Sequence, residues 1–348
     1  MELTFFTIIA ALIVCISYQP TREFNPNFLC LDNCINLRGI MAVGIILCHV
    51  LLEIPQPELG LSRIFLHCGY LFVSVFFLLS GYGCAIQYLR HGTAYFKRMP
   101  QKIVYLSILY ILSNLLFLFI QQLRKEGVSL VEFVFNQPYL GTTWYLIMQV
   151  FMYVLFWISL ILGKRVVGGV IFVFITLLLT SIILKCADAH VMWYYSNMSF
   201  AVGLYIGFFS LQVNNWLKGR FVFLSVLLSF LFCIISFSDV IVSRLFEIVC
   251  VNEIRHASRM FSTVIFSVLI LCVLSHLHSN KGLWRFIGNH SLEIYLLHAP
   301  IYFLLRSNIV FINDSLYYVI AVIVLSIIIA IPVKYLNDHI YVLIGKFL

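Results

Sequence analysis

The sequence is poor in charged residues. Only 10% of its 348 residues are Asp, Glu, Lys or Arg, whereas 62% are hydrophobic. A soluble domain carries about 25% charged residues, so this composition excludes an ordinary soluble protein. No long polar linker divides the chain, and no segment alternates as the strands of a membrane β-barrel do. We therefore predict an all-α, polytopic transmembrane helix bundle that forms a single integral membrane domain.

The motifs of several enzyme classes are also missing. There is no HExxH motif and no histidine pair at helical i, i+4 spacing, and the thiols of Cys30 and Cys34 alone do not make a zinc site, so we predict no metal. Glycine-rich nucleotide motifs and the G-x-S-x-G nucleophile elbow are absent. The net charge of +8 comes from Lys and Arg in short loops, which indicates contact with anionic lipid and no nucleic-acid partner.

The apolar runs predict about ten to eleven membrane spans, because each run has about the length that crosses a hydrocarbon core. They cover residues 3–18, 36–53, 64–89, 103–122, 143–163, 167–184, 198–213, 220–238, 258–277, 290–306 and 316–335. With the N-terminus outside, fourteen of the 22 Lys and Arg residues fall in inside segments, which is the expected bias. This orientation places Arg38 and the loop at 90–102 on the cytoplasmic side.

The segment that organises the chain is 37–49, in which Arg38 precedes and His49 ends an uncharged run. Eleven helical steps are within about 20° of three full turns, so both residues lie on one helix face about 16 Å apart. An ionisable residue near the membrane midplane favours a functional role, although a packed core histidine is the alternative. Neutral imidazole can act as a general base for a hydroxyl, and a guanidinium can hold a phosphate or polarise a carbonyl.

A basic stretch follows the 64–89 run and includes Arg90, Lys97, Arg98 and Lys102. Basic cytoplasmic loops are common in membrane proteins, which is one interpretation. The other is an anion site for the phosphates of a cytosolic donor, since Arg98 and Lys102 lie one helical turn apart.

Further candidates line the expected spans. Ser80 and Tyr82 flank glycines that suit close helix packing or a helix break. Trp144 and Tyr145 stand where an interfacial aromatic anchor or a platform for a sugar ring would stand. Tyr295 and His298 share a helix face with Ser291. His67 and His190 lie near span ends, and we interpret them as surface residues.

Four segments in this order resemble motifs of the membrane acyltransferase-3 family. They are the arginine-x10-histidine segment 37–49, FFLLSGY at 76–82, TWYL at 143–146 and IGNHSLEIYLLHAP at 287–300. Arg38 and His49 match the family's essential pair. The family's basic motif usually reads R-x-x-R, whereas here Arg98 is followed by Gln101 and Lys102. The resemblance implies a family-like core at 36–335, preceded by an additional helix and linker at 1–35 and followed by a cytoplasmic tail at 336–348.

The resemblance implies an enzyme of the O-acyltransferase class with no permanently bound cofactor. Its donor would be acetyl-CoA or another acyl-CoA, and its acceptor a hydroxyl of an envelope glycan or a lipid-linked sugar. A multi-pass protein of the bacterial inner membrane, in contact with lipid and with partners in envelope biosynthesis, would then be expected. Arg98, Lys102 and Lys97 would bind the donor, His49 would be the base, and Ser80, Tyr82, Trp144, Tyr145, Tyr295 and His298 would line the site.

A transporter or flippase of polysaccharide precursors is the alternative from another class. It would explain the helices and use a midplane histidine as a proton relay. Inverted repeats and paired broken helices would be expected, and the sequence shows neither.

Overall fold

The fold is almost entirely helical, as the apolar runs predict. The structure, a computed structural model, describes residues 2–92, 94–124, 142–162, 166–238, 251–279 and 282–345. Its α-helices are α1 (Glu2–Ile16), α2 (Leu31–Leu52), α3 (Gln56–Leu59), α4 (Gly69–His91), α5 (Ala94–Leu123), α7 (Trp144–Leu162), α8 (Val166–Cys186), α9 (Met198–Phe208), α10 (Ser210–Leu217), α11 (Phe221–Ser236), α13 (Val251–Leu274), α14 (Leu283–Asn289), α15 (Ser291–Leu305) and α16 (Ser315–Gly345). The 3₁₀ helices η1 (Gly60–Phe65) and η3 (Val191–Trp193) and a two-stranded antiparallel pairing of β1 (Tyr18–Pro20) with β2 (Leu277–Ser279) complete the described elements.

Each predicted apolar run contains a helix, and the prediction of an all-α multi-pass membrane protein is confirmed. Within the described ranges, seven helices are long and apolar enough to span a membrane. The number becomes eight if α10 and α11, which meet at 96°, form one broken span, and α1 and α15 are shorter apolar helices. The predicted tail begins inside α16, which continues to Gly345.

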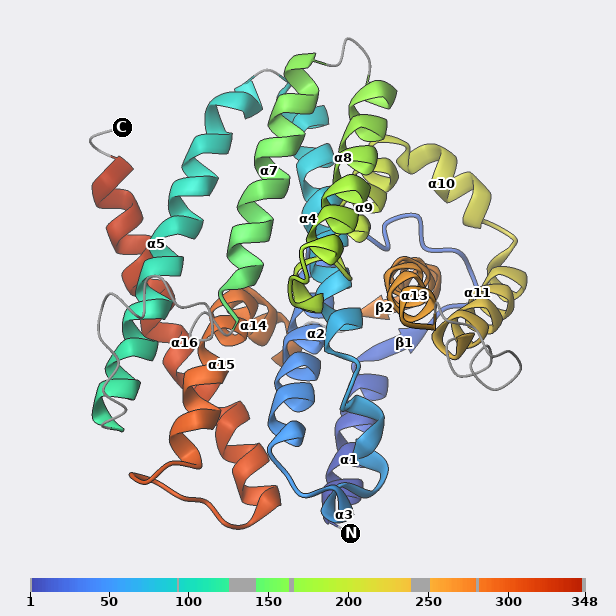
Figure 1. Cartoon of the computed structure of the whole chain (residues 1–348). Coiled ribbons are helices and arrows are strands. Elements are labelled where there is room, and N and C mark those ends of the chain that lie inside the picture. The colour runs from blue at the N-terminus through green and yellow to red at the C-terminus, as the bar shows by residue number, and fades with distance from the viewer. Residues whose placement is uncertain are drawn as a thin grey trace.

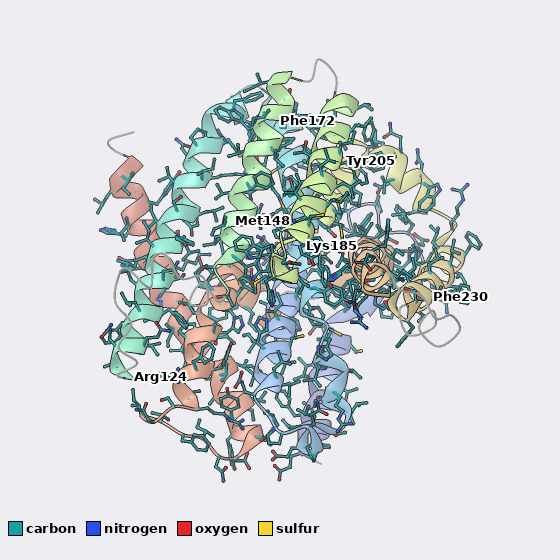
Figure 2. The ribbon with its side chains drawn as sticks, in the orientation of Figure 1. Arg124, Met148, Phe172, Lys185, Tyr205 and Phe230 are labelled. Atoms are coloured by element: carbon teal, nitrogen blue, oxygen red, sulfur yellow. The ribbon has the colours of Figure 1, made fainter. Side chains whose placement is uncertain are left out.

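The outer surface of the bundle is apolar, which suits contact with lipid. Only 22% of the apolar membrane-spanning segment of α8 is buried inside the protein. Tyr205 and Phe230 project from the outside of α9 and α11 (Figure 2), and they are 50% and 62% exposed. Such a continuous apolar exterior would be unstable in water and is expected of an integral membrane protein.

Helix α2 is the most enclosed of the candidate spans, because 72% of its apolar segment is buried. It packs against α4, α14 and α15. The approach to α14 depends on two glycines, because a methyl group added at Gly39 would overlap the carbonyl of Trp284, and one at Gly288 would overlap that of Ile35. Glycine at these positions lets the two backbones touch and fixes α2 in the centre of the bundle.

Helices α4 and α9 also pack backbone to backbone. A methyl group at Gly81 would overlap the Phe200 carbonyl, and one at Gly203 would overlap the Leu78 carbonyl. The packing role considered for the glycines of the 76–83 segment therefore applies to Gly81. It does not apply to Gly83, where an added methyl group would meet nothing within 4 Å.

Several helix termini lie at two opposite ends of the bundle. The end of α4, the start of α5, the end of α7 and the start of α8 lie together at the top of Figure 1, whereas the N-terminus of α1 and the connection between α15 and α16 lie at the bottom. Helices α5 and α16 flank one side of the bundle, and α11 and α13 flank the other (Figure 1).

Candidate active site

The first cavity, which we call the Arg38 cavity, has a volume of about 650 Å³. Its wall includes Arg38 from α2, Arg90 from α4 and Lys102 from α5, and its described lining contains no Asp or Glu. Ser80, Tyr82 and Tyr153 also line it, as do Asn27 and Asn214. Three cations without a carboxylate make this cavity suitable for an anionic ligand such as a phosphate group.

Lys102 is held in place by a neighbouring tyrosine, whereas Arg38 has a buried nitrogen without a partner in the part of the chain that the structure describes. Lys102 Nζ donates a hydrogen bond of 2.9 Å to the hydroxyl of Tyr95 and lies 4.8 Å from the centre of that ring. Nε of Arg38 is buried and has no hydrogen-bond partner among the described residues. A buried donor without a partner is costly, so a ligand that accepts from Arg38 would relieve that cost.

The second cavity, the His49 cavity, has a volume of about 360 Å³. Its wall is largely apolar and aromatic, with Trp144, Tyr70, Tyr195 and Tyr295 among the lining residues. Its described lining includes Arg259 and three histidines, His49, His67 and His190, and no carboxylate. Aromatic faces beside a few polar groups are typical of sites for small organic ligands.

The two cavities lie at opposite ends of α4. Gly69, the first residue of α4, lines the His49 cavity, whereas Arg90, next to its last residue, lines the Arg38 cavity. Those residues are about 32 Å apart along the helix. Helix α2 reaches both cavities, because Arg38 lines one and His49 lines the other.

His49 is paired with His298 of α15. Nδ1 of His49 lies 2.6 Å from Nε2 of His298, and the two rings are stacked with centroids 4.9 Å apart. Nδ1 of His298 in turn lies 2.5 Å from the backbone carbonyl oxygen of Tyr295. His298 is fully buried.

These contacts define the tautomers of the neutral pair. A carbonyl oxygen can only accept, so Nδ1 of His298 carries the proton and its Nε2 has a lone pair. Nδ1 of His49 must then donate to that lone pair, which leaves Nε2 of His49 unprotonated. The Nε2 atom lies 4.0 Å from the position of a Cβ added to Gly69, which lines the His49 cavity. The geometry therefore presents a proton acceptor at this cavity, and a glycine leaves room beside it.

The structure brings most of the predicted site residues to the two cavities. Ser80 and Tyr82 join Arg38 and Lys102, and Trp144 and Tyr295 join His49. Tyr145 is buried between them and stacks on Phe77 with ring centroids 4.9 Å apart. Arg98 is exposed and does not line the Arg38 cavity, and the side chain of Lys97 lies outside the described part of the chain.

Sequence reasoning named Arg90 only as part of the basic stretch, and it missed several other residues of these cavities. Arg90 and Tyr153 line the Arg38 cavity, and Arg259 and Tyr70 line the His49 cavity, where Arg259 donates to the Tyr70 hydroxyl at 2.8 Å. His67 and His190 are exposed, as predicted, but they also line the His49 cavity. A signal was present for Tyr153, because Tyr145, Gln149 and Tyr153 follow at intervals of four in an otherwise apolar helix. Among the residues that the structure describes, no three His, Cys, Asp or Glu side chains are grouped to hold a metal ion.

The bundle and its two cavities define an integral multi-pass membrane protein with a hydrogen-bonded histidine pair beside one cavity. Residues 32–335, most of the chain, match the family model described as an acyltransferase domain. The chain therefore belongs to the acyltransferase-3 family, and it is a membrane acyltransferase. Comparison with curated proteins and with solved structures gave no match.

Proposed function

We propose that this protein transfers an acyl group, acetyl in the first instance, from acyl-CoA to a hydroxyl of an envelope glycan or a lipid-linked sugar. Two features of α2 carry the proposal: Nε2 of His49 is unprotonated, and Arg38 lines a separate cavity whose described charged residues are all cations. Family membership supplies the reaction class, and the chemistry of each cavity suits one substrate.

The donor is assigned to the Arg38 cavity. The phosphates of CoA match Arg38, Arg90 and Lys102, because the cavity offers three cations and no described carboxylate. The end of α4 and the start of α5 carry two of these groups, and the distribution of Lys and Arg assigns that end to the cytoplasm, where acyl-CoA is made. Arg98 would then contribute only through long-range attraction, since its side chain is exposed.

The acceptor is assigned to the His49 cavity, where aromatic rings can pack against a sugar. Nε2 of His49 removes the proton of the acceptor hydroxyl as its oxygen attacks the thioester carbonyl carbon. The carbon–sulfur bond then breaks, and the CoA sulfur takes the proton from His49. His298 stabilises the intervening imidazolium by accepting the Nδ1–H of His49, and Tyr295 holds His298 through its backbone carbonyl.

A bacterial inner membrane is the setting that this reaction requires, since it places acyl-CoA on one side and envelope glycans on the other. Lipid surrounds the bundle, and proteins of envelope biosynthesis would deliver the acceptor. No permanently bound cofactor enters the reaction as proposed.

The test uses purified protein reconstituted in lipid, with radiolabelled acetyl-CoA and an envelope glycan extract from cells lacking the gene. We expect label in the glycan with wild type and a loss of at least 100-fold in kcat with His49→Ala. Lys102→Met should raise the KM for acetyl-CoA about tenfold, whereas Arg98→Met, its matched control, should change KM less than threefold. Undiminished transfer by a folded His49→Ala protein would refute the base, and no transfer by wild type would refute the reaction and favour the transporter interpretation.

A further inference from the structure

The layer between the two cavities contains a polar group that no step of the proposed reaction uses. On α4, Val73 lines the His49 cavity and Leu79 lines the Arg38 cavity, so about 9 Å of helix separates them. Phe76 and Phe77 lie in this interval. Tyr145 packs against both, with ring centroids 6.1 Å from Phe76 and 4.9 Å from Phe77. The layer is completed by Tyr295, whose ring centroid is 5.1 Å from that of Tyr145.

Helix α7 runs through this layer from one cavity to the other. Trp144 lines the His49 cavity and Tyr153 lines the Arg38 cavity. Between them, Tyr145 and Gln149 lie on the same helix face as Tyr153, because successive members of the series are four residues apart. Gln149 is therefore placed about midway along the part of α7 that lies between the two cavities.

Only the oxygen of the Gln149 side-chain amide has a hydrogen-bond partner in the described structure. Its Oε1 accepts a hydrogen bond of 3.1 Å from the Tyr145 hydroxyl. Its Nε2 is buried and has no partner among the described residues, and the side chain is 2% exposed. Leaving a buried amide donor unpaired is costly, and a carbonyl oxygen of a bound ligand would supply the missing acceptor.

We propose that Nε2 of Gln149 donates a hydrogen bond to an amide carbonyl of the pantetheine arm as the arm passes from the Arg38 cavity to His49. This inference rests on the proposed acyl-CoA donor. To reach His49 the arm must part the rings of this layer, and its amides need partners once water is left behind. Gln149 supplies a donor there, and the unpartnered Nε of Arg38 supplies another at the entrance. Gln149 is thus a positioning residue for the donor, and the acyl transfer itself remains with His49.

The test compares three acetyl thioesters that differ in their amides. Acetyl-CoA has two amides, S-acetyl-N-acetylcysteamine has one, and S-acetyl-1-hexanethiol has none. Gln149→Met keeps the side-chain volume but removes the donor. We expect it to lower kcat/KM about tenfold for the two amide-bearing thioesters and less than twofold for S-acetyl-1-hexanethiol.

Gln121→Met is the matched control. Gln121 is also buried, at 5% exposure, with Oε1 unpartnered in the described structure, but it lines neither cavity. It should leave the ratios among the three donors unchanged. Equal losses with all three donors in Gln149→Met would show a structural role and overturn the proposal, as would no loss with any. A wild type that acetylates nothing from acetyl-CoA would instead refute the proposed function, so the two failures are distinct.

Discussion

His298→Leu removes the group that accepts the Nδ1–H of His49 and keeps a buried side chain of similar size. In the wild type, that hydrogen bond holds Nε2 of His49 unprotonated and facing its cavity. In the variant, Nδ1–H would face leucine and lose its partner, at a cost of about 1–3 kcal/mol. The other tautomer, with the proton on Nε2, would be favoured because Nε2–H can reach water in the cavity.

The expected consequence is a fall in kcat of about 10- to 100-fold, since about 1.4 kcal/mol corresponds to tenfold. The KM for acetyl-CoA should change little, because His298 does not line the Arg38 cavity. Steady-state acetyl transfer by the reconstituted protein measures both constants. His298→Gln, whose amide oxygen can accept the Nδ1–H, should retain more activity than His298→Leu. The exposed His339, which lines neither cavity, provides the control variant His339→Leu. Wild-type kcat in folded His298→Leu would refute the tautomer argument.

Two further predictions concern stability and are read from thermal unfolding in detergent. Gly81→Ala forces a methyl group against the Phe200 carbonyl, so it should destabilise the protein by about 1–3 kcal/mol and lower Tm by several degrees. The control is Gly83→Ala, whose added methyl group meets nothing within 4 Å and should not lower Tm. Equal Tm values for the two variants would show that α4 and α9 can separate at no cost. Burial lowers the pKa of His276, whose ring stacks on Phe221 at 3.9 Å between centroids, so the folded state binds its proton less readily than the unfolded state. The stability that neutral His276 supports should be present above its unfolded pKa of about 6.5 and be lost as the pH falls below it. His276→Gln should flatten this part of the Tm–pH curve, and an unchanged slope would assign the loss to other groups.

The long helices could be predicted from the sequence because each one contains an apolar run with polar residues at its ends, whereas the short helices α3 and α14 lie outside the predicted runs. Arg38 and His49 could be placed on one helix for the same reason, since their spacing is local. The pairing of His49 with His298 could not, because it joins residues 249 positions apart and depends on how α2 and α15 pack. His298 was a candidate from the sequence because it shares one face of α15 with Tyr295, and the structure places it in contact with His49.

The spacing of Arg98 and Lys102 did not reveal which of the two side chains faces a cavity. Arg98 and Lys102 are one turn apart on α5, yet only Lys102 lines the Arg38 cavity. Which side of α5 faces inward is decided by its packing on α7 and α16, which are distant in sequence. Arg90 belonged to the basic stretch but was not chosen as a donor-binding residue, because the sequence does not show which side of α4 faces the cavity. Gln149 carried a readable signal, a lone amide in an apolar span, but its unpaired Nε2 is visible only in the structure.

The aromatic layer between the cavities has a consequence for the energetics of the reaction. In the proposed transfer, the acceptor's proton moves inward to the CoA sulfur while the acyl group moves outward to the acceptor oxygen. The acyl group crosses the layer as part of the neutral thioester, and the acceptor's proton returns across it on the neutral thiol of CoA. The exchange is therefore electroneutral, and the membrane voltage, which acts on net displaced charge, does no work on it. The thioester bond alone drives the modification, so the enzyme would run equally well in an energised and in a depolarised membrane.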